Sequence, residues 1–148
     1  MRVSTSTVII NAPREIVWSA VTLREHVRQW QFGSDLTTDW IVGHPIRFRA
    51  QWQGATFEQW GTVEEFNAPQ RLRYSLFAPR PELEDRPENY FTMTYELTDV
   101  EDGTEVRFIH EDPREPDDAE FESDEENPVL IALREFAESL ANSSPYSP

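Results

Sequence analysis

The chain has 148 residues, no cysteine and a formal net charge of −15, because 28 acidic residues face 13 basic ones. This length suits one domain, and the missing thiols exclude a disulfide framework and a thiolate metal site. The negative charge argues against nucleic acid or an anionic membrane surface as a partner, since both are bound mainly through lysine and arginine.

The first elements predicted along the chain are a strand and two short helices. Ser6 to Ile10 is rich in β-branched residues, which are typical of strands. The Asn-Ala-Pro sequence at 11–13 supplies a cap and a first-turn proline for one helix, and apolar residues follow at helical spacing. Thr22 to Glu25 has the form of a capping box for a second helix that ends near Trp30.

Alternation of apolar and polar residues then predicts five strands. They cover Pro45–Trp52, Thr56–Phe66, Arg71–Phe77, Tyr90–Thr98 and Thr104–His110. The period of two gives each of these strands an apolar face, and the short connections favour an antiparallel meander with one face buried.

The last predicted element is a long amphipathic helix that begins at Asn127-Pro128, a cap followed by a first-turn proline. Its apolar stripe is expected to contain Val129, Leu133, Phe136, Ala137 and Leu140. It is the only predicted helix long enough to cover a sheet. The order of elements therefore predicts an α+β protein.

Residues 111–126 differ in composition from the rest of the chain. Ten of these sixteen residues are acidic and two are proline, so we expect a solvated acidic loop. The stretch lacks the alternating acidic pattern of a calcium-binding loop. We expect the tail at about 142–148 to be disordered.

Four short motifs, in order, resemble a known superfamily. They are Ala-Pro-x-x-x-Val-Trp at 12–18, His-Val-x-x-Trp at 26–30, Gly-Thr-Val at 61–63 and Ala-Pro-x-Arg-Leu at 68–72. Their order and spacing resemble the helix-grip, START-like (SRPBCC, Bet v 1-like) superfamily. Within it the sequence is most similar to single-domain proteins named after the activator of the heat-shock-protein ATPase.

The resemblance covers residues 6 to 141 and implies one START-like domain over residues 1–148. It implies a curved antiparallel sheet wrapped around a long C-terminal helix, with two short helices after the first strand and a cavity between sheet and helix. Two positions depart from the family pattern. Gln31 follows Trp30 where a second tryptophan is usual, and residues 126–128 lack a glycine-tryptophan pair.

Nine residues are candidates to line that cavity. They are Trp30, Phe48, Trp60, Tyr74, Tyr95, Phe108, His110, Leu133 and Phe136. Aromatic residues at period two are also typical of simple core packing, so each remains open to that interpretation. His110 is expected to point inward as a hydrogen-bonded structural residue, whereas His26 and His44 are expected to face solvent.

The functional hypothesis is binding of an unidentified apolar or aromatic small molecule in this cavity. No motif for catalysis, a metal or a cofactor is present, and none of these is expected. An enzyme of the cyclase or hydrolase type stays open, with His110 and Tyr74 or Tyr95 as the acid/base pair. The resemblance also leaves open a regulator of a heat-shock ATPase, and the chain could be a monomer or a homodimer.

The acidity has two interpretations, an acidic docking surface for a basic partner or adaptation to concentrated salt. We favour salt adaptation, because the charge is spread along the chain and every basic residue is arginine. No apolar run reaches the length of a signal peptide or a membrane span, so we expect a cytoplasmic protein.

Overall fold

The computed structural model describes residues 2–31, 33–113, 119–123 and 128–143 of the chain. The strands are β1 (Arg2–Ile10), β2 (Asp35–Thr37), β3 (Pro45–Trp52), β4 (Ala55–Asn67), β5 (Arg71–Leu76), β6 (Phe91–Val100), β7 (Gly103–Asp112) and β8 (Ala119–Ser123). The helices are α1 (Arg14–Thr22), α2 (Arg24–Trp30), the 3₁₀ turn η1 (Pro87–Asn89) and α3 (Pro128–Ser143).

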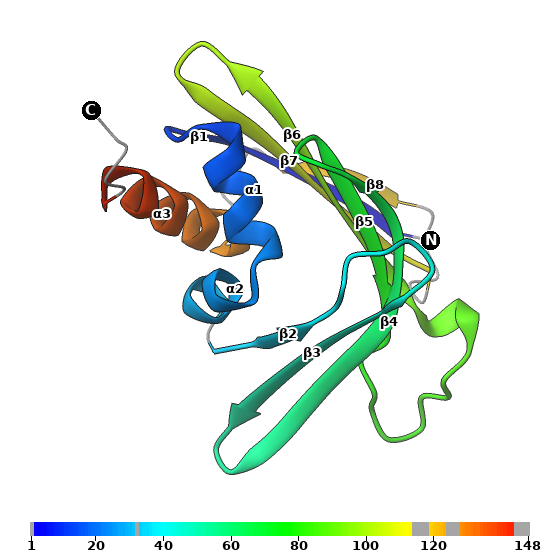
Figure 1. Cartoon of the computed structure of the whole chain (residues 1–148). Helices are drawn as coiled ribbons and strands as arrows, with labels where there is room; N and C mark the ends of the chain where they lie inside the picture. Colours follow the sequence, from blue (N-terminus) through cyan, green and yellow to red (C-terminus); the bar gives the residue numbers. More distant parts are fainter. Residues whose placement is uncertain (1, 32, 114–118, 124–127, 144–148) are drawn as a thin grey trace.

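The strands form one curved sheet in the order β2-β3-β4-β5-β6-β7-β1-β8 (Figure 1). Neighbouring strands from β2 to β1 pair antiparallel, and only β8 pairs parallel, with the first residues of β1. A two-residue turn at Gln53 and Gly54 joins β3 to β4, with φ of 50° and 79°. Positive φ at both central residues matches the twist of a hairpin, and glycine adopts it without steric cost.

The three α-helices lie on one side of the sheet (Figure 1). Helix α3 packs against α1 and β1, and α1 also contacts β6 and β7. Helix α2 contacts β2, whereas β3 and β4 contact mainly their neighbouring strands. The β3–β4 hairpin therefore projects away from the helical layer, as Figure 1 shows.

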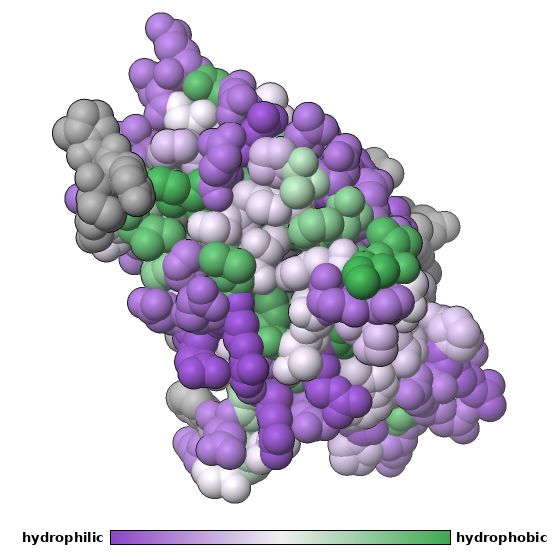
Figure 2. Space-filling model, in the orientation of Figure 1, coloured by the Kyte–Doolittle hydropathy of each residue, from purple (hydrophilic) through white to green (hydrophobic). Residues whose placement is uncertain are grey.

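The core lies between the sheet and the helices. Ile10, Val17, Leu72, Leu130 and Leu133 are among its fully buried side chains. The face seen in Figure 2 is largely hydrophilic, with apolar surface in separate places. The predicted α+β helix-grip fold, with two short helices after the first strand, is confirmed.

The predicted bounds were accurate for the five strands of the meander, and the predicted caps of α1 and α2 were wrong. Strand β3 has the predicted bounds, and β4 to β7 differ by one or two residues at one end or both. Strand β1 begins at Arg2 rather than Ser6, and the short strand β2 was not predicted. Pro13 is the N-cap of α1 rather than a first-turn residue. The capping box at Thr22 is wrong, because Thr22 belongs to α1 and its Oγ1 donates to the Trp18 carbonyl, while Leu23 caps α2.

Helix α3 is rotated relative to the predicted stripe. Leu130, Leu133, Ala137 and Ala141 are its buried residues, whereas Val129 is 37% exposed and Phe136 is half-buried. The stripe at this spacing still covers one side of the helix. Leu133 and Ala137 were correctly assigned to the apolar stripe of α3, and Val129 lies at the edge of this stripe.

The acidic stretch 111–126 is not one uninterrupted loop. Glu111 and Asp112 extend β7, and Ala119–Ser123 form β8 against β1. Backbone hydrogen bonding to an edge strand can order a polar segment that has little apolar area to bury. The predicted tail is helical at residues 142 and 143, and its remainder lies outside the described residues.

Candidate ligand-binding cavity

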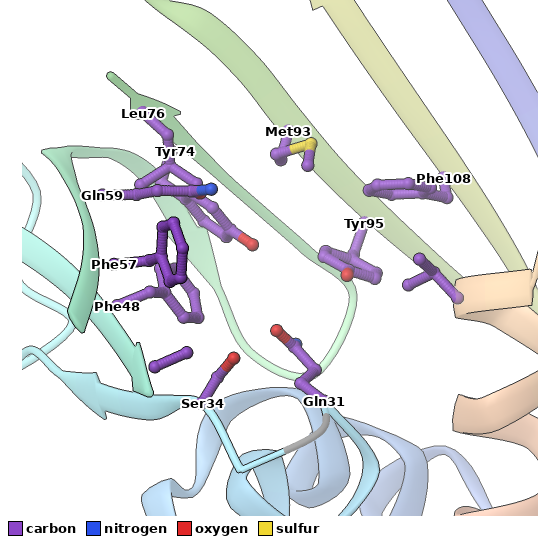
Figure 3. A pocket seen from close by; sticks show the side chains of 12 residues that line it. Gln31, Ser34, Phe48, Phe57, Gln59, Tyr74, Leu76, Met93, Tyr95 and Phe108 are labelled. Carbon is purple, nitrogen blue, oxygen red and sulfur yellow. The ribbon is translucent and has the colours of Figure 1, made fainter. Parts of the chain in front are cut away.

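A cavity of about 240 Å³ opens between the concave face of the sheet, the end of α2 and the start of α3. Its lining residues are Gln31, Ser34, Phe48, Ala50, Phe57, Gln59, Tyr74, Leu76, Met93, Tyr95, Phe108 and Val129 (Figure 3). Strands β3 to β7 supply most of them, because side chains at alternate positions of neighbouring strands point to the same face. The lining is mainly apolar, as small-molecule sites are.

The inner end of the cavity is formed by buried side chains of β5, β6 and β7. Tyr74, Leu76, Tyr95 and Phe108 are all at most 5% exposed. The Tyr95 and Phe108 ring centroids lie 4.8 Å apart, and those of Phe48 and Tyr74 lie 5.7 Å apart. These contacts fall within the range of favourable aromatic pairs and fix the orientation of the rings.

The mouth of the cavity is more exposed and more polar. Phe57 on β4 is 55% exposed, and Val129 in the first turn of α3 is 37% exposed. Gln31, Ser34 and Gln59 are half-buried, and Gln31 and Ser34 enter from the α2 side in Figure 3. The cavity thus passes from a polar rim to an aromatic interior.

The polar side chains of the rim are available to a ligand. Within the described part of the chain, Gln31, Ser34 and Gln59 make no side-chain hydrogen bond to protein. Amide and hydroxyl groups of this kind provide orientation in an otherwise apolar site.

Two tyrosines, Tyr74 and Tyr95, lie buried at the inner end. Burial is the main reason that the pKa of each phenol lies well above its usual value of 10.0. The neighbouring phenol has a smaller effect, which raises the pKa of Tyr74 further and opposes the increase at Tyr95. Both groups are therefore neutral at physiological pH.

Four of the nine predicted site residues line this cavity: Phe48, Tyr74, Tyr95 and Phe108. Three others lie in the helical layer outside its described lining. Trp30 is buried and its Nε1 donates to the Ala20 carbonyl at 2.7 Å, and Leu133 is fully buried in the core. The half-buried Phe136 packs against His26, with ring centroids 5.4 Å apart.

Trp60 points away from the cavity, contrary to the prediction. The register of β4 places Phe57 and Gln59 on the concave face, so Trp60 lies on the convex face. There its ring packs against Phe77, with centroids 5.5 Å apart, and its Nε1 donates to Asp85 at 3.2 Å.

The histidines also differ from the predictions in part. His110 is half-buried beside Phe91, with ring centroids 5.2 Å apart, and lies outside the described cavity lining. His26 is half-buried rather than solvent-facing, and its Nδ1 lies 3.1 Å from the Ser19 carbonyl oxygen. His44 is exposed as predicted, and its Nδ1 lies 2.7 Å from an Asp39 carboxylate oxygen.

Sequence analysis did not select several lining residues. Ala50, Leu76 and Met93 occupy apolar faces of predicted strands, so the period of two could have identified them. Gln59 could not have been found in this way, because a polar residue interrupts the apolar pattern. Gln31 was noted only as a departure from the family pattern.

The described residues show two further absences. No three His, Asp or Glu side chains among them are grouped so that they could hold a metal ion. None of the described helices is long and apolar enough to cross a membrane.

The curved sheet, the long C-terminal helix and the cavity between them define a helix-grip protein of the START-like class. The family model for Activator of Hsp90 ATPase homolog 1-like proteins matches residues 11–141, so the chain belongs to this family. No curated protein matches the sequence significantly.

Solved structures agree with this assignment. Protein ChR145 from Cytophaga hutchinsonii is 28% identical, with a TM-score of 0.71 over 95% of this chain and 97% of that one. An AHSA1-like protein from Aeromonas hydrophila is 16% identical, with a TM-score of 0.69 over 93% and 92% of the two chains. The Aha1 dimer from Colwellia psychrerythraea is 20% identical, with a TM-score of 0.58 over 80% and 81%.

Proposed function

We propose that the protein binds a small apolar or aromatic molecule in the cavity between β3–β7 and the start of α3. The observation that carries this proposal is an aromatic-lined cavity with four buried side chains at its inner end. The polar side chains at its rim make no side-chain hydrogen bond to the residues that the structure describes. Apolar walls supply affinity, and a few placed polar groups supply orientation.

The size of the cavity limits the ligand. Its volume of about 240 Å³ lies below the roughly 300–1,000 Å³ of sites for drug-sized molecules. A ligand of about two fused or linked rings matches this space better than a sterol or a long acyl chain. Stacking on Phe48, Tyr95 or Phe108 would favour a planar ring system.

Titration of the labelled protein with naphthalene, followed by NMR, tests the proposal. We expect saturable shifts of the methyl signals of Leu76, Met93 and Val129 together, because these residues lie on three different elements around one space. The exposed side chains of Ile41 and Val42, which are outside the lining, serve as an internal control. Shifts limited to such surface residues, or no shifts, would exclude binding in the cavity.

Family membership favours a second candidate, regulation of a heat-shock ATPase. The family is named for an activator of the Hsp90 ATPase, and one structural neighbour is an Aha1 dimer. Capture of the heat-shock ATPase of the same organism by the tagged protein, with increased ATP hydrolysis, would support this role. Absence of both, with naphthalene binding intact, would leave ligand binding as the function.

A further inference from the structure

We infer that the cavity selects an uncharged aromatic ligand that carries a hydrogen-bond acceptor, such as a ketone or aldehyde oxygen, and rejects carboxylates. The inference rests on the proposed function, because it requires that a small molecule enter the cavity. It adds the ligand's charge and polar group, and it assigns the hydroxyls of Tyr74 and Tyr95 as the donors that recognise that group.

The donors are the two buried phenols at the inner end. Tyr74 and Tyr95 are 4% and 2% exposed, and each carries a hydroxyl proton that it can donate to an acceptor. Figure 3 shows both hydroxyls at the cavity, with Tyr95 between Phe108 and Gln31. Among the described residues, neither hydroxyl donates to a carbonyl or carboxylate oxygen of the protein. A ligand carbonyl at the inner end would give these donors an acceptor.

The absence of charge in the described lining argues against an anionic ligand. No Asp, Glu, Arg or Lys is among the twelve lining residues. A carboxylate moved from water to the buried inner end would gain no cationic partner, and its desolvation would be costly. The net charge of −15 over the whole chain adds a repulsive field.

A cationic ligand is also disfavoured by the inner end. Its buried polar groups are phenols that stay protonated, so they provide no negative charge to pair with an ammonium group. The carboxylates of the protein contribute nothing to the described lining. The transfer of a ligand from water into this environment costs the least free energy when the ligand is neutral.

Three naphthalenes of nearly equal shape separate these effects. They are 2-acetylnaphthalene, 2-isopropenylnaphthalene, which has CH₂ in place of the carbonyl oxygen, and 2-naphthoate. In the wild-type protein at neutral pH and molar salt, calorimetric or fluorescence titration should show the ketone binding roughly two- to tenfold more tightly than the alkene. We expect 2-naphthoate to bind at least about tenfold more weakly than the ketone.

The double variant Tyr74→Phe, Tyr95→Phe tests the donors. We expect the preference for the ketone over the alkene to fall to about one, with the alkene affinity unchanged within about twofold. Tyr90→Phe is the matched control, because the Tyr90 hydroxyl donates to Asp85 outside the cavity. This variant should keep the wild-type preference.

A second readout does not depend on the variant. The ketone labelled with ¹³C at its carbonyl should show, when bound to the wild-type protein, a carbonyl signal downfield of its position in cyclohexane, which has no hydrogen-bond donor, because a phenol proton polarises the C=O bond. A bound carbonyl signal at the cyclohexane position would overturn the assignment of the tyrosine donors.

The outcomes distinguish this inference from the proposed function. Equal binding of ketone and alkene, or binding of 2-naphthoate as tight as the ketone, would overturn the inference and leave the proposed function standing. If none of the three compounds binds, the proposed function itself fails. A ketone preference that survives in the double variant would assign the acceptor contact to another residue and overturn the role of Tyr74 and Tyr95.

Discussion

Tyr74 and Tyr95 bring two hydroxyls into a region that is otherwise built from rings and aliphatic side chains. Burial is the main reason that the pKa of each of these phenols lies above its usual value. The neutral forms are strongly favoured in the folded state. Ionisation of these residues is therefore linked to unfolding.

This linkage predicts loss of stability in alkaline solution. A phenol with a raised folded-state pKa contributes stability that is fully present below the unfolded value of 10.0 and is lost as the pH rises through the folded value. Spectrophotometric titration of the four tyrosines should therefore show two that ionise only as the protein unfolds.

The Tyr95→Phe variant should lose one late ionisation, and its stability should fall less steeply above pH 10.0. Tyr90→Phe should retain both late ionisations. Early, reversible ionisation of all tyrosines in the folded protein would show that Tyr74 and Tyr95 are accessible to water.

Individual side chains show where the alternation of apolar and polar residues predicts the correct face of the sheet. It correctly assigned Phe48, Tyr74, Tyr95 and Phe108 to the concave face, because their strands alternate regularly. It failed for Trp60, whose convex position is stabilised by Phe77 and Asp85. Contacts with residues distant in the sequence determine the face on which Trp60 lies. Alternation within one strand carries no information about such contacts.

At the scale of elements, the close approach of β4 and β5 depends on Gly61. A Cβ atom at this position would lie 1.8 Å from the Ser75 carbonyl oxygen, although Gly61 has no positive φ. Steric exclusion, and not backbone conformation, therefore requires glycine here. These two strands also carry Gln59, Tyr74 and Leu76, so their separation affects the cavity wall.

Gly61→Ala should force β4 and β5 apart and lower the free energy of unfolding by about 1–3 kcal/mol or more, as overpacking does. Chemical denaturation in molar salt measures this change. Thr62→Ala, at the exposed next position, is the matched control and should remain within about 0.5 kcal/mol of the wild type. Equal stability of both variants would contradict the steric role of Gly61.

The helices were predicted less accurately than the strands. Residues 128–143 were recognised as a helix, but its rotation depends on packing against α1 and β1, which places Leu130 inside and Val129 at the cavity mouth. Within the helix alone, Leu130 and Val129 are equally compatible with the apolar stripe. Strand β8 was missed because its pairing with β1, and not an apolar pattern of its own, defines it.

At the scale of the whole molecule, the net charge of −15 acts on a domain with a conventional buried core. Mutual repulsion of the carboxylates favours the expanded chain in dilute buffer. At about 1 M salt the Debye length is only about 3 Å, and most of this repulsion is screened. The hypothesis of salt adaptation follows from this balance.

The melting temperature should therefore rise as salt increases from dilute buffer to the molar range. Thermal melts in sodium or potassium chloride measure this dependence, and a neutral osmolyte at matched osmolality controls for exclusion effects. A melting temperature that stays flat or falls would favour the alternative, an acidic docking surface.

For the proposed ligand, the projecting β3–β4 hairpin affects the kinetics of exchange. It carries Phe48 and Phe57 on the cavity side, yet it packs mainly against neighbouring strands rather than against the helices. Bending of the hairpin would widen the entrance without separating α1 and α3 from the sheet. Ligand residence time would then follow local opening on the microsecond-to-millisecond scale typical of such motions, and it would be independent of the much slower global unfolding rate.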